Sequence, residues 1–259
     1  MTEWLGYSLT DLLPYSQEAW LRLLELYNAR FWPMVLLGLA IGIASLLLLP
    51  TAGLRSLVLP GVILCWGLCW LWVAWGFQLQ TYARLNWAGS YFALAFAVQG
   101  LLLLGSGVWA SRWTPSPTSI RALSRAPKRA LNSSRQRGEA ADWADQASDS
   151  GWIGYGIVLF AVLVLPLVGL LQGHVWKGLA LFGSTPDPTA IATLGLAVLL
   201  HGRLPLLLIA LLLLIPASWC LISAATLAAM DDALWPLPLL SALLGVVAAS
   251  RGASRASRR

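Results

Sequence analysis

The side chains in this chain that could do chemistry are five polar residues in loops between apolar runs. We predict that they gather on one face of the protein: His174, Lys177, Asp187, Asp231 and Asp232. A histidine beside two or three carboxylates could hold a metal ion or supply a base for hydrolysis. Their spacing matches no recognised ligand motif, and ordinary loop polarity is the simpler explanation. We therefore assign no catalytic residue and no metal site from the sequence.

Four small residues within apolar runs predict close helix packing. Cys65 and Cys69 are one helical turn apart, as are Gly38 and Gly42. Residues four positions apart share a helix face, and small residues at this spacing let membrane helices approach closely. A soft metal or redox role for the cysteines is the alternative, but two thiolates without further ligands make an incomplete site.

No cofactor is expected. His174 and His201 flank the same predicted helix, so they cannot share one haem iron. The predicted membrane spans also contain no acidic, basic or histidine side chain. Because charge buried in lipid is costly and is kept mainly for function, this pattern disfavours proton or ion transport. A carrier of a neutral or apolar compound stays compatible with it.

The elements that position these residues are predicted to be membrane helices. The chain has 259 residues, of which 58% are hydrophobic and 11% charged, whereas a soluble domain has about 25% charged residues. Uncharged apolar runs of about 20 residues are long enough to cross the hydrocarbon core of a bilayer. We predict an all-α bundle of seven transmembrane helices over residues 32–49, 56–77, 87–110, 152–172, 189–200, 204–230 and 233–250. The fifth is short for a full crossing and could gain length from residues 179–182.

The basic residues predict the orientation of this bundle. Short cytoplasmic loops carry an excess of Lys and Arg. With seven crossings, thirteen of the seventeen basic residues fall on one side and four on the other. This places the N-terminus outside and the C-terminus inside. The formal net charge of +6 then reports topology and attraction to lipid headgroups, and no nucleic acid partner is expected.

Changes in composition divide the chain into five segments. Residues 1–31 are predicted to hold an amphipathic helix with Ser16 as its N-cap, which lies either in the outer membrane interface or as a soluble helix over the outer loops. Residues 32–110 form a three-helix bundle, and residues 152–250 form a four-helix bundle. Residues 111–151 are rich in Ser, Arg, Ala and Asp, which is typical of a flexible cytoplasmic linker. Residues 251–259 form a basic cytoplasmic tail.

Two motifs resemble a known family. They are YNARFWP (Tyr27 to Pro33), followed by an apolar run, and GHVWKGLALFGSTPDPTAIATLG (Gly173 to Gly195). On these residues the chain is similar to a family of uncharacterised polytopic membrane proteins of bacteria, classed as a domain of unknown function. In that family the turn commonly reads Pro-Cys-Pro-Thr, whereas here Asp187 stands in the place of the cysteine. The resemblance implies a multi-pass protein of the bacterial inner membrane and supplies no activity.

Two classes of function remain open from the sequence. The first is a non-enzymatic membrane component, either an accessory subunit or a permease-like carrier of a weakly polar compound. Its expected partners are the lipid bilayer and, for a subunit, other membrane proteins. The second is a membrane enzyme or metal site that acts on a lipid-soluble substrate at the outer face, through His174 and nearby carboxylates. A carrier needs a cavity that reaches the middle of the membrane between the two bundles, and a solidly packed interior would count against it. The enzyme needs His174 within hydrogen-bonding reach of a carboxylate.

Overall fold

The described part of the chain is all-helical. The structure is a computed structural model that describes residues 15–51, 58–113, 151–201 and 203–256, and these ranges contain helices and no β-strand. The helices are α1 (Gln17–Arg30), α2 (Trp32–Leu48), α3 (Val58–Trp72) with its π-helical continuation η4 (Val73–Leu79), α4 (Gly89–Trp113), the helix Gly151–Leu171, α8 (Pro186–Leu199), α9 (Leu206–Ala229) and α10 (Pro236–Ala256). The helix Gly151–Leu171 contains a π-helical turn, η7 (Phe160–Val164), and ends as α7 (Leu165–Leu171). Short 3-10 turns lie at Leu49–Thr51, Tyr82–Arg84 and Trp176–Gly178.

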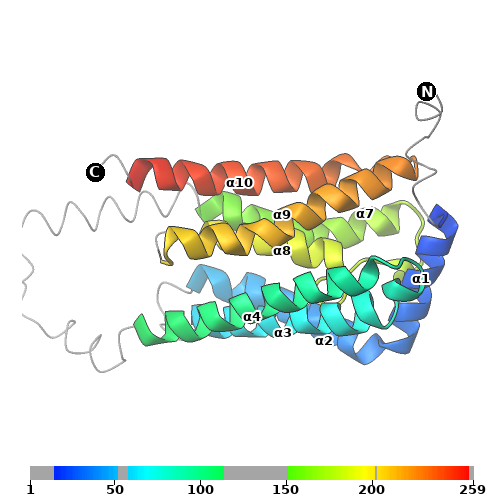
Figure 1. Ribbon diagram of the computed structural model, residues 1–259, viewed down its shortest axis with the longest axis horizontal. Helices are drawn as coiled ribbons and strands as arrows, with labels where there is room; N and C mark the ends of the chain where they lie inside the picture. Colours follow the sequence, from blue (N-terminus) through cyan, green and yellow to red (C-terminus); the bar gives the residue numbers. More distant parts are fainter. Residues whose placement is uncertain (1–14, 52–57, 114–150, 202, 257–259) are drawn as a thin grey trace, which may run out of the picture.

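All of these helices except α1 run side by side along the long axis of the molecule (Figure 1). Helix α3 packs along α4, and α8 packs against α9, α10 and η7. Contacts between α4 and α9 and between α2 and η7 join the N-terminal helices to the C-terminal ones. Helix α1 lies across one end of this bundle and meets α2 at an angle of 92°.

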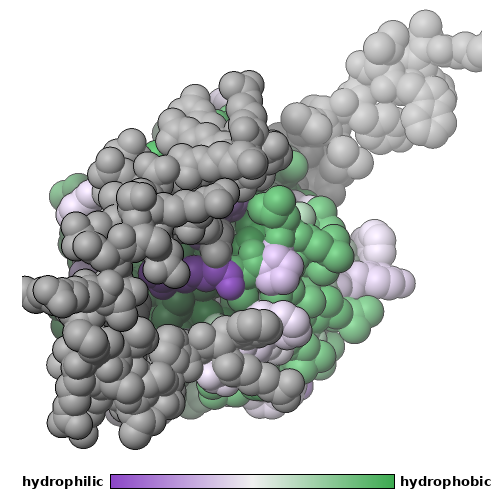
Figure 2. All heavy atoms as spheres, turned by 90° about the vertical axis from the view of Figure 1, so that its left-hand side faces the viewer, coloured by the Kyte–Doolittle hydropathy of each residue, from purple (hydrophilic) through white to green (hydrophobic). Residues whose placement is uncertain are grey.

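Four helices are long and apolar enough to cross a membrane: Val58–Arg84, Gly89–Ser111, Gly151–Leu171 and Leu206–Ala229. The bent pair of α1 and α2 would make a fifth, and two shorter apolar helices span Pro186–Leu199 and Pro236–Ser250. Large apolar side chains cover the outer surface of the bundle, including Leu47, Leu101, Leu171, Leu207 and Leu214. The flank visible in the end-on view of Figure 2 is accordingly largely hydrophobic. Such a surface on a soluble monomer would be unusual.

The amphipathic helix expected near the N-terminus is present as α1. Its N-cap is Ser16, whose hydroxyl accepts a hydrogen bond from the backbone N–H of Ala19 at 3.3 Å. Glu18 in the first turn and Arg30 in the last turn complement the helix dipole. The side of α1 that faces the bundle buries Leu24, among others, so α1 packs on the end of the bundle.

Proline interrupts α9, and a side chain from a neighbouring helix compensates. Pro216 lies inside α9 and has no N–H to donate to the carbonyl of Leu212, four residues earlier. The buried amide of Gln99 in α4 donates to that carbonyl at 3.1 Å. This bond explains why a fully buried glutamine lies between apolar helices and ties α4 to α9.

Two predicted segments fall at or beyond the edge of the described residues. Most of the predicted linker 111–151 lies outside the described ranges. The predicted tail 251–259 begins inside α10, which continues to Ala256, and residues 257–259 lie outside the description. The other predicted helices begin and end within a few residues of the observed ones, as with residues 204–230 and the observed α9.

Candidate functional site

The segment before α8 enters the bundle without helical structure. Leu179, Leu181, Phe182, Ser184 and Thr185 are all buried, and α8 begins only at Pro186. Nearly every residue of α8 is buried as well, so α8 is surrounded by protein on all sides. The region of the predicted fifth span therefore consists of an irregular, largely buried segment of residues 179–185 followed by a helix of 14 residues. Irregular backbone inside a bundle requires other groups to satisfy its polar atoms.

Tyr27 and Asn28 of helix α1 form hydrogen bonds to some of these polar backbone atoms. The Asn28 amide donates to the carbonyls of Lys177 at 2.6 Å and Leu179 at 2.9 Å. The Tyr27 hydroxyl donates to the carbonyl of Ser184 at 2.8 Å and accepts from the indole N–H of Trp72 at 3.0 Å. Burial raises the pKa of Tyr27, so this hydroxyl keeps the proton that it donates. The motif that begins at Tyr27 and the motif that begins at Gly173 are thus joined in space by hydrogen bonds.

Threonines of the segment and of α8 satisfy further backbone groups. The hydroxyl of Thr189 accepts from the N–H of Gly183 at 2.9 Å and donates to the carbonyl of Thr185 at 2.7 Å. The hydroxyl of Thr185 donates to the carbonyl of Leu181 at 3.0 Å. These two threonines therefore satisfy three backbone groups at and before the start of α8.

Glycines let α2 approach the irregular segment closely. A Cβ atom at Gly38 would lie 2.7 Å from the carbonyl oxygen of Phe182, and one at Gly42 would lie 2.8 Å from the Phe182 ring. Gly183 has a positive φ of 74°, and a Cβ there would lie 2.9 Å from the Cα of Gly38 and 3.0 Å from the sulfur of Cys69. The pattern Gly38/Gly42 thus receives an unwound segment of the chain as well as the side chain of Val162.

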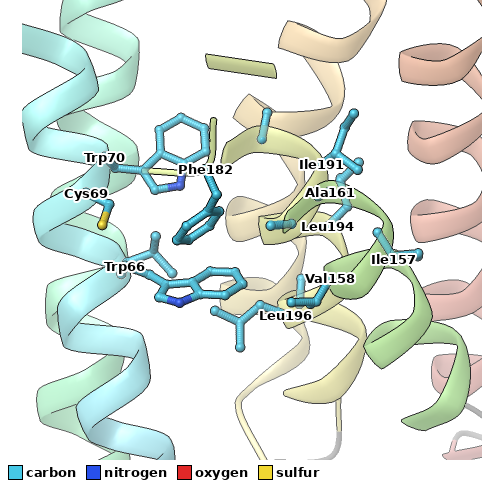
Figure 3. Close-up of a cluster of buried hydrophobic side chains, with 14 of the residues drawn as sticks. Trp66, Cys69, Trp70, Ile157, Val158, Ala161, Phe182, Ile191, Leu194 and Leu196 are labelled. Atoms are coloured by element: carbon cyan, nitrogen blue, oxygen red, sulfur yellow. The ribbon is translucent and has the colours of Figure 1, made fainter. Parts of the chain in front are cut away.

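The ring of Phe182 fills the space between α3, α8 and the helix Gly151–Leu171 (Figure 3). Its centroid is 4.8 Å from that of Trp66. The indole N–H groups of Trp66 and Trp70 donate to the hydroxyls of Ser45 in α2 and Thr193 in α8, both at 2.8 Å. These contacts pack the middle of the described bundle solidly, so this region holds no passage between the N-terminal and C-terminal helices.

Asp187 differs most from its prediction. The sequence placed it in an outer loop, but it is the second residue of α8 and lies inside the bundle. Its Oδ1 accepts a hydrogen bond from the indole N–H of Trp219 in α9 at 2.7 Å. Trp219 lies ten residues before the end of α9 at Ala229, which corresponds to about 15 Å at 1.5 Å per residue. Asp187 thus belongs to the observed helix α8, although it precedes the predicted span of residues 189–200.

A cavity of about 100 Å³ opens beside Asp187, beneath α1. Most of its lining is apolar and comes from α1, α7, α8, α9 and α10, including Leu21, Leu165, Leu179, Ile191, Leu227 and Leu237. Its polar lining residues are Gln17, Gln172, His174, Asp187 and Asp232. A second space of about 20 Å³, which is large enough for one water molecule, lies on the other side of Asp187 near Tyr15, Tyr82 and Ser223.

The structure brings together three of the five predicted polar residues. His174, Asp187 and Asp232 line the cavity. Lys177 lies outside it, with its ammonium group 5.5 Å from the centroid of the Trp176 ring. Asp231 is exposed, has a positive φ of 55° and does not line the cavity.

Direct contact between His174 and a carboxylate is not observed. Within the described residues, the one ion pair joins Arg22 to Glu25, and no hydrogen bond links His174 to an aspartate. Asp232 instead accepts from the backbone N–H of Leu234 at 2.8 Å and from the Gln17 amide at 3.3 Å. The described residues also contain no group of three or more His, Cys, Asp or Glu side chains placed to hold a metal ion.

The two cysteines lie on different surfaces of α3. Cys69 is buried against the irregular segment near Gly183, whereas Cys65 is exposed on the outside of the bundle. Cys69 therefore packs inside the protein and Cys65 does not.

Sequence reasoning missed two residues that build this site and misplaced a third. Tyr27 and Asn28 were noted as part of a motif, but the partners that they hold are about 150 residues away in the chain. Asp187 was assigned to a loop because prolines flank it on both sides. A short apolar run interrupted by Gly and Pro is itself a signal of a discontinuous helix and of a binding site beside it, and this signal could have identified Asp187.

The fold and the site define an all-helical protein with four helices long and apolar enough to span a membrane, and with a small cavity at one end. Residues 139–257 match the model of a family of unknown function, DUF6064. This match includes the segment Gly173 to Gly195 and helices α8, α9 and α10, and does not reach Tyr27 to Pro33. No curated protein matches the chain. No solved structure matches it.

Proposed function

We propose that this chain is a multi-pass membrane protein that binds a small, weakly polar compound in the cavity beneath α1. The observation that carries the proposal is the cavity itself, which lies beside the start of a discontinuous helix. Several membrane transporters bind their substrates at such helix breaks, where irregular backbone lines a cavity.

The proposal includes seven crossings, with the N-terminus outside and the C-terminus inside. Seven helices lie side by side along the long axis: α2, α3, α4, Gly151–Leu171, α8, α9 and α10. Helix α8 has 14 residues, which rise about 21 Å. The buried residues 179–185 that precede it add the length needed for a hydrocarbon core of about 30 Å.

In this arrangement Asp187 would lie well below the membrane surface. Its partner Trp219 is about 15 Å along α9 from the end nearest α1. An acidic residue at such a depth is costly and normally serves a function. The cavity that it lines therefore reaches toward the middle of the membrane from the outer end. We favour binding over catalysis because no carboxylate of the described residues lies within hydrogen-bonding distance of His174.

The experiment measures binding of n-butyramide, a small neutral amide, to the purified full chain in detergent. Ala180 lines the cavity, so Ala180→Phe should fill it and weaken binding at least tenfold. The matched control is Ala225→Phe, which adds the same ring at an exposed position of α9. Equal affinity of the wild type and both variants would contradict the proposed function. Thermal unfolding of each variant verifies that it folds.

A further inference from the structure

We infer that the compound bound in this cavity is a small organic cation, such as a primary amine in its ammonium form, with Asp187 as its counter-charge. This inference rests on the proposed function and adds the chemical class of the ligand. It follows from the size, the polarity and the charge of the cavity.

The size of the cavity limits the ligand to a few atoms. Its volume is about 100 Å³, whereas an apolar cavity of about 150 Å³ accommodates benzene. A ligand with an apolar part of four or five non-hydrogen atoms therefore fits. A longer molecule could insert one end.

The lining favours an apolar body with one polar end. Most of the lining side chains are aliphatic, and the polar ones are few. A water molecule in such a space needs two to four polar partners, which the aliphatic part does not offer. The apolar part of a ligand would therefore displace water that is poorly held there.

The lining contains two carboxyl groups, and no Lys or Arg of the described residues balances them there. Asp187 and Asp232 both line the cavity, and its lining contains no Lys or Arg. Within the described residues neither aspartate forms an ion pair. Two basic side chains at this end of the molecule already have other partners. Arg22 forms an ion pair with Glu25 at 2.9 Å, and the ammonium group of Lys177 lies over the ring of Trp176. A carboxylate in apolar surroundings is costly without a cation, and a bound ammonium group would supply one.

The carboxylate of Asp187 is already oriented for this role. The indole N–H of Trp219 holds its Oδ1 at 2.7 Å, and the side chain lines the cavity on one side and the water-sized space on the other. Trp20 lines both spaces, and an aromatic face attracts a cation within about 6 Å of its centroid. An ammonium group beside Asp187 would therefore meet a fixed acceptor.

The test compares n-butylammonium with n-butyramide and n-butyrate on the full chain in detergent, with binding measured by titration. We expect n-butylammonium to bind at least tenfold more tightly than n-butyramide, and n-butyrate to bind least. Asp187→Asn should remove this preference, because asparagine carries no charge, while its carbonyl can still accept from Trp219. The control Asp231→Asn changes an exposed aspartate outside the cavity and should leave all three affinities unchanged.

The possible failures are distinguishable. Binding of n-butyramide as tight as that of n-butylammonium, or full n-butylammonium affinity in a folded Asp187→Asn, would overturn the cation inference and leave the proposed function in place. Should Asp187→Asn not fold, Asp232→Asn provides the second test, and unchanged n-butylammonium affinity there would count against the inference. Failure of the folded wild-type chain to bind any of the three probes would overturn both proposals.

Discussion

The close approach between α2 and the irregular segment predicts that Gly38 tolerates no side chain. In Gly38→Ala the added Cβ would lie 2.7 Å from the carbonyl oxygen of Phe182 and 3.0 Å from the carbonyl carbon of Gly183. Both neighbours are backbone atoms, so no rotamer change relieves the contact. Overpacking of this kind costs about 1–3 kcal/mol.

Gly105→Ala is the matched control. Gly105 is an exposed residue of α4, and a Cβ added there would meet no atom within 4 Å. Replacing glycine by alanine in a helix gains up to about 1 kcal/mol, and this gain applies to both variants. The difference between the variants therefore isolates the contact with the segment, and Gly38→Ala should be less stable than Gly105→Ala by about 1–3 kcal/mol.

The assay is thermal unfolding of both variants and the wild type in the same detergent. For a chain of this size, 1 kcal/mol corresponds to a shift in Tm of about 2–4 °C. Equal melting temperatures for Gly38→Ala and Gly105→Ala would refute the claim that α2 packs on the backbone of the irregular segment.

Two further predictions concern buried hydrogen bonds. Tyr27→Phe leaves the carbonyl of Ser184 and the indole of Trp72 without their partner, so it should lower the free energy of unfolding by about 2–4 kcal/mol. The control is Tyr91→Phe, because Tyr91 is 68% exposed, and this variant should change the free energy of unfolding by less than about 0.5 kcal/mol. Gln99→Leu should cost about 1–3 kcal/mol by unfolding measurements, because it leaves a buried carbonyl in α9 unpaired. That cost should shrink in a Pro216→Ala background, where the new backbone N–H can bind the same carbonyl, and an unchanged cost would be evidence against the compensation.

The positions of the helices could be predicted from the sequence because they depend on local apolar length. Uncharged runs of sufficient length predicted each observed helix of the bundle, and Ser16 predicted the start of α1. These features depend on neighbouring residues, so a single sequence contains the information needed.

The irregular segment and its anchors could not be predicted in the same way. The start of α8 at Pro186 and the burial of Asp187 depend on partners in α1 and α9. From the sequence alone, nothing distinguishes Asn28 from a solvent-facing helix residue. Its role depends on hydrogen bonds to the carbonyls of Lys177 and Leu179. Contacts between such distant positions leave no periodic pattern in one sequence.

The same reasoning explains the partial agreement at the polar site. His174, Asp187 and Asp232 line one cavity at the same end of the molecule, with His174 in a loop and Asp187 in the first turn of α8. The direction of each side chain depends on the turn that carries it, so Lys177 lies on Trp176 and Asp231 faces away from the cavity.

The central claim is that residues 179–199 form one discontinuous crossing. Reporters of compartment fused to the N-terminus and after Arg259 test it most directly, because this crossing decides whether the total is odd or even. The account predicts an external N-terminus and a cytoplasmic C-terminus. Both ends in one compartment would contradict it.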